Sequence, residues 1–201
     1  MISKSEIKSI TQLQQKKYRD ARNLFVAEGP KVIAELLAEG IELEAMYALE
    51  PSQILKDNYH KVSLQELKKI SSLKNANSSL AVFHKPKATT LKHNGLIVAL
   101  DAVRDPGNLG TIIRLCDWFG VSQLLCSKDT ADCYNPKVIQ ATMGSIARVS
   151  IHYLDLLAEL KRTNLPIFGA FMDGKNVYKA SLPTEGILVM GNEAKGVSVE
   201  I

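Results

Sequence analysis

The chain has 201 residues, of which 46% are apolar and 23% are charged. This ordinary composition excludes wholesale disorder, collagen and a disulfide framework, and the length allows one large domain or two small ones. No stretch of about 18 apolar residues is present, and no signal-peptide core follows the first lysine. The sequence therefore predicts a cytoplasmic protein without a membrane partner, whose three cysteines are reduced.

The net charge of +4 is concentrated in the first half of the chain. Residues 1–93 hold 15 Lys and Arg against 10 Asp and Glu, whereas residues 94–201 hold 10 against 11. Residues 1–22 alone carry six basic and two acidic side chains. Such a cluster suits a polyanion, because neutralised phosphates release condensed counterions. A solvated helix face explains the same charges equally well.

In the first half, periodicity and turn residues predict a small α/β unit. Helices are predicted over residues 5–17 and 30–39, with Gly40 ending the second, and from Ser63 onward. Glu66 stands three residues after Ser63, which is the spacing of a capping box. Short apolar runs predict strands over residues 24–27, 45–49 and 80–83.

The second half predicts a parallel sheet covered on both faces. A continuous apolar run marks a strand at residues 96–100, and similar runs predict strands at residues 121–126, 166–171 and 187–190. Helical patterns separate them, at residues 109–119, 136–143 and 153–162. Alternation at this pace is typical of parallel α/β domains.

The turn after the predicted strand at residues 96–100 carries a first candidate site. Ligands of open parallel sheets gather at the carboxyl ends of strands, so polar residues there are candidates for binding or catalysis. We interpret Asn108 as the N-cap of the next helix, Gly110 as clearing space in its first turn, and Arg114 as reaching over that space. A helix whose Arg114 merely pairs with Asp117 is the alternative.

The segment after the predicted strand at residues 187–190 carries a second candidate site. Gly191 and Gly196 bracket Glu193 and Lys195. Gly191 allows a ligand close to the backbone, and Gly196 permits a left-handed turn that brings the loop back over it. An ordinary turn with solvated charges is the alternative, but two such loops in one chain favour a site.

Several common sites are missing from the sequence. No Gly-x-Gly-x-x-Gly and no Gly-x-x-x-x-Gly-Lys-Ser/Thr motif is present, which argues against a nucleotide-dependent oxidoreductase and against P-loop chemistry. The four histidines have no metal-ligand spacing and the cysteines match no zinc pattern, so no metal site is predicted.

The two loops together resemble a known family. Residues 108–114, Asn-Leu-Gly-Thr-Ile-Ile-Arg, resemble motif 1 of the SpoU, or TrmH, family of RNA ribose 2′-O-methyltransferases. Residues 190–196, Met-Gly-Asn-Glu-Ala-Lys-Gly, resemble its motif 2. Residues 25–35 are similar to the small α/β RNA-binding domain that many members carry before the catalytic domain. The resemblance therefore extends over nearly the whole chain.

The resemblance implies an α/β protein in two parts. An RNA-binding domain is expected at residues 1–88 and, after a linker at 89–95, a parallel-sheet methyltransferase domain of the SPOUT superfamily at 96–201. S-adenosylmethionine as cofactor, a homodimer and a C-terminal trefoil knot are also implied. Relatives carry a third motif some tens of residues after motif 2, so a chain that stops at Ile201 is expected to be truncated, with its knot incomplete.

The resemblance also assigns roles to residues. Arg114 is expected at the catalytic centre as the orienter of the ribose hydroxyl, with Asn108 ordering the site and Glu193 as the motif 2 acid. Contacts to the cofactor are expected from Ala170, Met190, Gly191, Asn192 and Gly196. Contacts to RNA are expected from Lys16, Lys17, Arg19, Arg22 and Lys31.

The expected reaction is methyl transfer from S-adenosylmethionine to a ribose 2′-hydroxyl of ribosomal or transfer RNA. A non-catalytic RNA-binding protein that keeps the fold is the alternative. Loss of the motif 1 arginine would have favoured that alternative, and Arg114 is present.

Overall fold

A computed structural model describes residues 2–50 and 58–201. The chain forms two compact units, the first from residues 1–87 with 132–147 and the second from residues 88–131 with 148–201. The composition of the chain predicts a division near residue 88. It gives no sign that residues 132–147 pack with the first unit.

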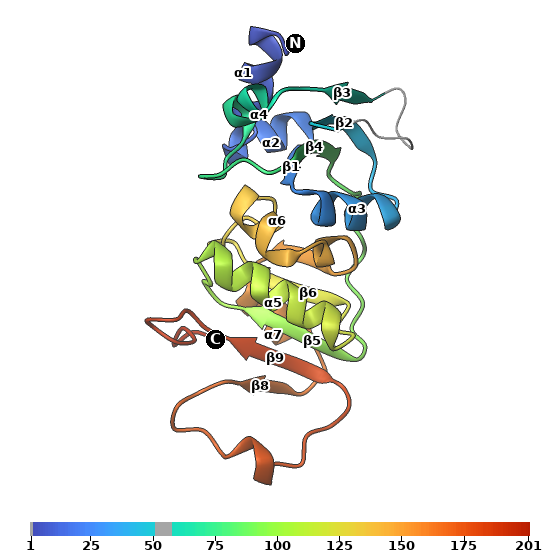
Figure 1. The fold of residues 1–201 in the computed structure, drawn as a ribbon. Helices are drawn as coiled ribbons and strands as arrows, with labels where there is room; N and C mark the ends of the chain where they lie inside the picture. Colours follow the sequence, from blue (N-terminus) through green and yellow to red (C-terminus); the bar gives the residue numbers. More distant parts are fainter. Residues whose placement is uncertain (1, 51–57) are drawn as a thin grey trace. The chain divides into compact units, whose positions relative to one another are not determined.

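The first unit is built on a four-stranded sheet with the order β1-β4-β2-β3 (Figure 1). Its strands are β1 (Leu24–Glu28), β2 (Leu43–Ala48), β3 (Tyr59–Lys61) and β4 (Ser79–His84). β4 runs antiparallel to β1 and β2, whereas β3 is parallel to β2. Its helices are α1 (Lys4–Gln12), α2 (Lys16–Arg22), α3 (Pro30–Ala38), α4 (Leu64–Ile70), α6 (Pro136–Thr142) and the 3-10 helix η1 (Ser145–Ala147).

The single helix predicted over residues 5–17 is wrong, because the structure has two helices there. α1 closes at its C-cap, Leu13, and α2 begins three residues later at Lys16. The capping box predicted at Ser63 is confirmed at the start of α4. The Glu66 carboxylate accepts hydrogen bonds from the backbone N–H groups of Ser63 and Ile2, which lower its pKa to about 2.

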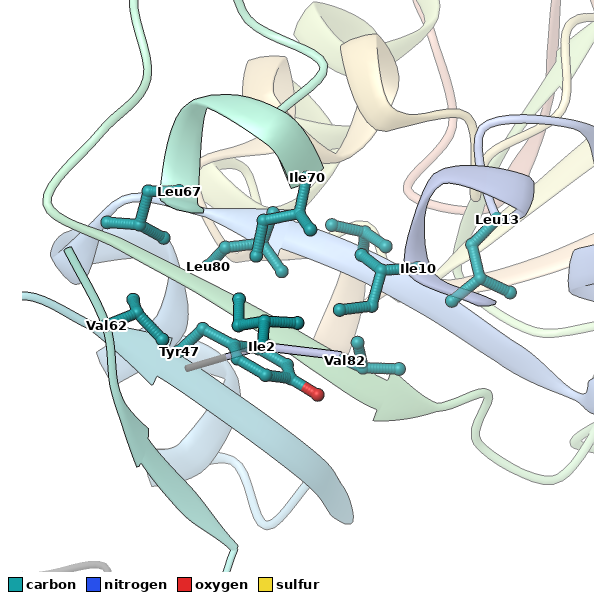
Figure 2. Packing of buried hydrophobic residues seen from close by; sticks show 10 residues of the cluster. Ile2, Ile10, Leu13, Tyr47, Val62, Leu67, Ile70, Leu80 and Val82 are labelled. Atoms are coloured by element: carbon teal, nitrogen blue, oxygen red, sulfur yellow. The ribbon is translucent and has the colours of Figure 1, made fainter. Parts of the chain in front are cut away.

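The core of the first unit lies between α1, α4 and the sheet (Figure 2). Buried apolar side chains from both helices and from strands far apart in sequence meet there, and their burial is the main stabilising term. They are Ile2, Ile10, Leu13, Val26, Tyr47, Val62, Leu67, Ile70, Leu80 and Val82.

Residues 132–147 belong to the first unit through side-chain contacts. The Arg19 guanidinium pairs with the Asp132 carboxylate, and the Phe25 and Tyr134 ring centroids are 5.1 Å apart. At the end of α6, Met143 adopts a left-handed conformation with φ 52° and Gly144 follows with φ 99°. The helix predicted over residues 136–143 therefore ends where expected.

The second unit is a five-stranded, entirely parallel sheet with the order β7-β6-β5-β9-β8 (Figure 1). Its strands are β5 (Leu96–Leu100), β6 (Gln123–Ser127), β7 (Ser150–Leu154), β8 (Ile167–Gly169) and β9 (Gly186–Met190). Its helices are α5 (Pro106–Trp118), α7 (Leu156–Arg162) and the 3-10 helix η2 (Val177–Lys179). The predicted parallel α/β architecture is confirmed.

The strand order places a topological switch point between β5 and β9. From β5 the chain passes through α5 to β6 on one side, whereas β9 pairs with β5 on the other side. The connection from β7 through α7 to β8 crosses the sheet in the opposite sense, so right-handed crossovers put α5 and α7 on opposite faces. Ligands of such sheets bind where the strand order reverses.

The segment expected as a linker, residues 89–95, has no helix or strand but is bound to the second unit. The side-chain amide of Gln123 donates to the backbone carbonyl of Lys92 at 2.6 Å and accepts from its N–H at 2.7 Å. Leu91 packs against the core beneath α7. The segment therefore has two anchors on the second unit.

Two strands were missed by the sequence analysis, and both lie at the edge of a sheet. β3 and β7 have few buried side chains, so neither shows the apolar run of a covered strand.

Among residues 2–50 and 58–201, no helix combines the length and apolarity needed to cross a bilayer. The three cysteines form no disulfide and are buried. The trefoil knot stays a prediction.

Candidate active site

The first candidate loop connects β5 to α5, and its helix cap differs from the prediction. Asp105, rather than Asn108, is the N-cap: its carboxylate accepts the backbone N–H of Asn108 at 2.8 Å. Pro106 occupies the first helical position, where its missing N–H costs nothing, and this sets the cap one residue before it. The Asn108 side chain is consequently not used in capping.

Asn108 and Glu193 are brought together from positions 85 residues apart. The Asn108 side-chain nitrogen donates to the Glu193 carboxylate at 3.1 Å. The two residues follow β5 and β9, the strands on either side of the switch point. This contact joins the two loops that the sequence analysis singled out separately.

The second candidate loop, after β9, is closed by its own hydrogen bonds. The backbone N–H and carbonyl groups of Asn192 and Gly196 bond to each other in both directions, at 2.9 and 2.8 Å. The Asn192 side-chain oxygen accepts the N–H groups of Ala194 and Lys195, and its nitrogen donates to the Ala102 carbonyl at 2.8 Å. Glu193 therefore projects from a loop whose backbone is well fixed.

The two glycines of this loop serve its closure. Gly196 has φ 72°, so the predicted left-handed turn is confirmed. A Cβ on Gly191 would lie 2.0 Å from the Gly196 carbonyl carbon and 2.1 Å from the Val197 nitrogen. The group that approaches Gly191 closely is thus the protein's own returning backbone, where the sequence analysis expected a ligand.

A cavity of about 540 Å³ opens between the two loops, within the range of small-molecule sites. It combines apolar side chains with amide, carboxylate and guanidinium groups. The lining residues are Val103, Arg104, Asp105, Asn108, Thr111, Ile112, Met190, Gly191, Asn192, Glu193 and Ala194. Five of the residues predicted from the resemblance (Asn108, Met190, Gly191, Asn192 and Glu193) are among them.

Six of the lining residues were missed by the sequence analysis: Val103, Arg104, Asp105, Thr111, Ile112 and Ala194. Their positions could have identified them, since Ala194 lies in the loop after β9 and the other five lie between the end of β5 and the first turns of α5. Arg104 pairs with Asp129 at 2.8 Å, and this guanidinium, with the Ser127 hydroxyl, holds the pKa of Asp129 below its usual range.

Arg114 lies outside the lining of the cavity. It is exposed on α5, one turn beyond Thr111, which does line it. The alternative pairing with Asp117 is absent, because Asp117 is bound by Arg148 at 2.8 and 3.0 Å. Within residues 2–50 and 58–201, Arg114 has no hydrogen bond or ion pair, so its guanidinium is available to a bound molecule.

Ala170 and Gly196 also lie outside the cavity lining, although both belong to the same edge of the sheet. Ala170 follows β8, and its N–H donates to the Val189 carbonyl of β9 at 3.1 Å. Gly196 closes the loop that carries Glu193.

The five predicted RNA-contacting residues differ in exposure. Lys16, Lys17, Arg22 and Lys31 are exposed, and Arg19 is buried. Arg19 is 2% exposed, donates to the carbonyls of Leu13 and Gln14, and pairs with Asp132. The expectation that Arg19 contacts RNA is wrong, because its guanidinium is buried and all of these partners lie within the first unit.

Arg22 has a partly structural role. Its guanidinium donates to the backbone carbonyl and hydroxyl of Ser9 and to the side chain of Gln12, and so ties α2 to α1.

In the described part of the chain, no group of three or more His, Cys, Asp and Glu side chains is arranged to hold a metal ion.

The fold and the cavity define a class: a parallel α/β domain with a small-molecule site at its switch point, joined to a small mixed-sheet unit. Comparison with known proteins assigns the family. The chain belongs to the SpoU rRNA methylase family, whose model matches residues 95–201. Residues 4–81 match the MRM3-like substrate binding domain. The resemblance stated from the sequence is confirmed.

Individual proteins share both parts of the chain. A putative RNA methyltransferase of the TrmH family from Porphyromonas gingivalis is 37% identical, with a TM-score of 0.88 over all of this chain and 84% of the other. An AdoMet-bound rRNA methyltransferase from Sinorhizobium meliloti is 27% identical, with a TM-score of 0.85 over all of this chain and 82% of the other.

The 23S rRNA (guanosine(2553)-2′-O)-methyltransferase RlmP of Bacillus subtilis is 26% identical over 208 residues, covering 98% of this chain and 82% of its own length. The chain spans less than two fifths of the length of several vertebrate mitochondrial relatives that it also matches.

Proposed function

We propose that the protein transfers a methyl group from S-adenosylmethionine to a ribose 2′-hydroxyl of RNA, in ribosomal RNA by preference over transfer RNA. The observation that carries this proposal is the contact between Asn108 and Glu193 beside the switch-point cavity. It joins the two motifs of the family in one site. The functions of RlmP and of the Sinorhizobium meliloti enzyme support it. A site of action in the cytoplasm is part of the proposal.

The residues of the cavity fit S-adenosylmethionine. Val103, Ile112 and Met190 offer apolar surface for a purine, while the exposed carboxylates of Asp105 and Glu193 complement the positive charges of a sulfonium and an ammonium group. When bound, this cofactor supplies an activated methyl group.

The residues of the chain act by positioning. The ribose oxygen must approach the methyl carbon in line with the carbon–sulfur bond that breaks, and placing the two reactants contributes much of the rate. Arg114 is one turn beyond the cavity and is free to hold the ribose or its phosphate. A guanidinium does not deprotonate in proteins, so Arg114 donates hydrogen bonds and does not accept the hydroxyl proton.

The direct test is a transfer assay. The full chain is incubated with methyl-labelled S-adenosylmethionine and ribosomal or transfer RNA from cells that lack the gene, and 2′-O-methylnucleosides are quantified by mass spectrometry. Label in a ribose 2′-O-methyl group supports the proposal. RNA binding without transfer or cofactor binding would instead support the non-catalytic alternative.

The first unit is proposed to hold RNA through exposed cations. Changing Lys16, Lys17 and Lys31 to Glu should weaken RNA binding and reduce the slope of log affinity against log salt by about 2, because each lost phosphate contact removes about 0.7–0.9 from the slope. The same reversals at Lys161, Lys175 and Lys179, exposed in the second unit, are the matched control. Equal slopes for both triple variants would contradict the assignment.

We further propose that the protein forms a homodimer through α5. Leu115 and Trp118 in the last turns of this helix and its C-cap residue Phe119 lie on one face and are 49, 82 and 73% exposed. Such contiguous apolar exposure suits an interface. Trp118→Lys should yield monomers in sedimentation velocity at micromolar concentration. Tyr178→Lys, at an equally exposed aromatic residue of η2, should leave the dimer intact; dimers in both variants would exclude this face.

A further inference from the structure

Asp101 is a buried carboxylate beside the proposed cofactor site that neither motif includes. It directly follows β5 and is 6% exposed. One of its oxygens, Oδ2, accepts both the backbone N–H and the hydroxyl of Ser198, each at 2.6 Å. Its own N–H donates to the Met190 carbonyl at 2.9 Å. Asp101 therefore binds the chain both before and after the loop at residues 191–197.

The neighbouring residue holds the same loop at a second point. The Ala102 carbonyl accepts the Asn192 side-chain nitrogen at 2.8 Å, and the Ala102 N–H donates to the Ser127 hydroxyl at 2.9 Å. Ala102 has φ 54°, a conformation that residues other than glycine rarely adopt. Such a conformation persists when its surroundings over-determine it. The turn at residues 101–102 is thus a rigid anchor.

The geometry points to Asp101 as a positioning residue for the cofactor: with Ser198, it latches the loop at residues 191–197 closed before the cofactor binds. This inference rests on the proposed function for the identity of the ligand. Neither Asp101 nor Ser198 lines the cavity, whereas Gly191, Asn192, Glu193 and Ala194 all do. The latch acts through them, because a preformed wall spares the ligand the entropy of ordering the loop.

The latch predicts how two substitutions of Ser198, its exposed member, change cofactor affinity and turnover. Ser198→Ala removes the hydroxyl donor and should raise the dissociation constant and the KM for S-adenosylmethionine about tenfold, as expected for a lost hydrogen bond to a charged group. Turnover at saturating cofactor and the KM for RNA should change less than twofold. Ser198→Thr keeps a hydroxyl and should restore most of the affinity.

Asp101 is tested by single substitutions and by a double substitution that also changes Ser198. Asp101→Asn keeps an acceptor oxygen without the charge and should fall between the wild type and Asp101→Ala. Adding Ser198→Ala to Asp101→Ala should cause little further loss, since the two residues share one interaction. Asp155→Asn is the matched control: this carboxylate also accepts a backbone N–H, that of Ala158 at 3.0 Å, but caps α7 away from the cavity. It should leave cofactor affinity unchanged.

Amide hydrogen exchange without cofactor separates this inference from the proposed function. In Ser198→Ala, the N–H groups of Ala194, Lys195 and Gly196 should exchange faster than in the wild type, while those of α7 should not. Unchanged exchange, or a reduced turnover at saturating cofactor with unchanged KM, would overturn the latch. A wild-type chain that binds no S-adenosylmethionine would contradict the proposed function, and exchange would still decide the latch.

Discussion

Arg114→Ala is expected to lower methyl transfer by about 100- to 1,000-fold, the range for loss of one oriented donor at a reaction centre. Cofactor affinity should change less than twofold, because Arg114 does not line the cavity. Stability should be unaffected, since the side chain is exposed and has no ion pair among the described residues. Single-turnover transfer of labelled methyl groups and isothermal titration with S-adenosylmethionine measure the two quantities.

Two further substitutions sharpen this result. Arg114→Lys keeps the charge but loses the planar fork that binds a phosphate through two hydrogen bonds, so it should recover only part of the rate. Arg162→Ala removes another exposed arginine of the second unit, near Glu159, and should leave transfer unchanged. Normal single-turnover rates in Arg114→Ala would remove this residue from the mechanism.

Gly191→Ala is expected to weaken cofactor binding by about 100-fold, equivalent to an overpacking penalty of about 3 kcal/mol. The added Cβ would overlap the backbone of Gly196 and Val197, at 2.0–2.2 Å. Backbone atoms cannot rotate away as a side chain can, so the loop that carries Glu193 must open. Titration calorimetry measures the loss, and circular dichroism checks that the sheet is intact.

Gly196→Ala is the control within the same loop. No atom lies within 4 Å of its added Cβ, so the substitution introduces only the strain of a left-handed alanine, of about 1–2 kcal/mol. Its loss of cofactor affinity should stay below about 30-fold, the equivalent of about 2 kcal/mol. A larger loss than that of Gly191→Ala would show that conformational freedom, rather than close approach, governs this loop.

The parallel sheet was predictable because a strand that is covered on both faces consists of consecutive apolar residues, which can be recognised in the sequence. The apolar runs that became β5 and β9 are continuous, as expected where helices lie on both faces. β7 was missed, and its last two residues fell within the helix predicted at residues 153–162, because Ser150–Leu154 is only partly buried at the sheet edge. Burial on one side only leaves no run of apolar residues.

The roles of the basic residues in the first unit, in contrast, could not be predicted from the sequence. Lys16, Lys17, Arg19 and Arg22 are indistinguishable as members of a basic cluster. Only the fold reveals that Arg19 is buried against Asp132, 113 residues away, and that Arg22 ties α2 to α1. The partner of a long side chain depends on contacts between distant segments, and composition carries no information about those.

The sequence by itself determined the family, the parallel sheet and the two loops that meet at its switch point. The motifs and the apolar runs of the strands consist of residues that are close together in the sequence. The tertiary structure alone decided which atoms meet there. It assigned the helix cap to Asp105, paired Asn108 with Glu193, filled the space at Gly191 with the protein's own backbone and buried Asp101 against Ser198. The contacts of Asn108 with Glu193 and of Asp101 with Ser198 depend on strands β5 and β9 being neighbours, because hydrogen bonds across about 90 residues form only once that pairing exists.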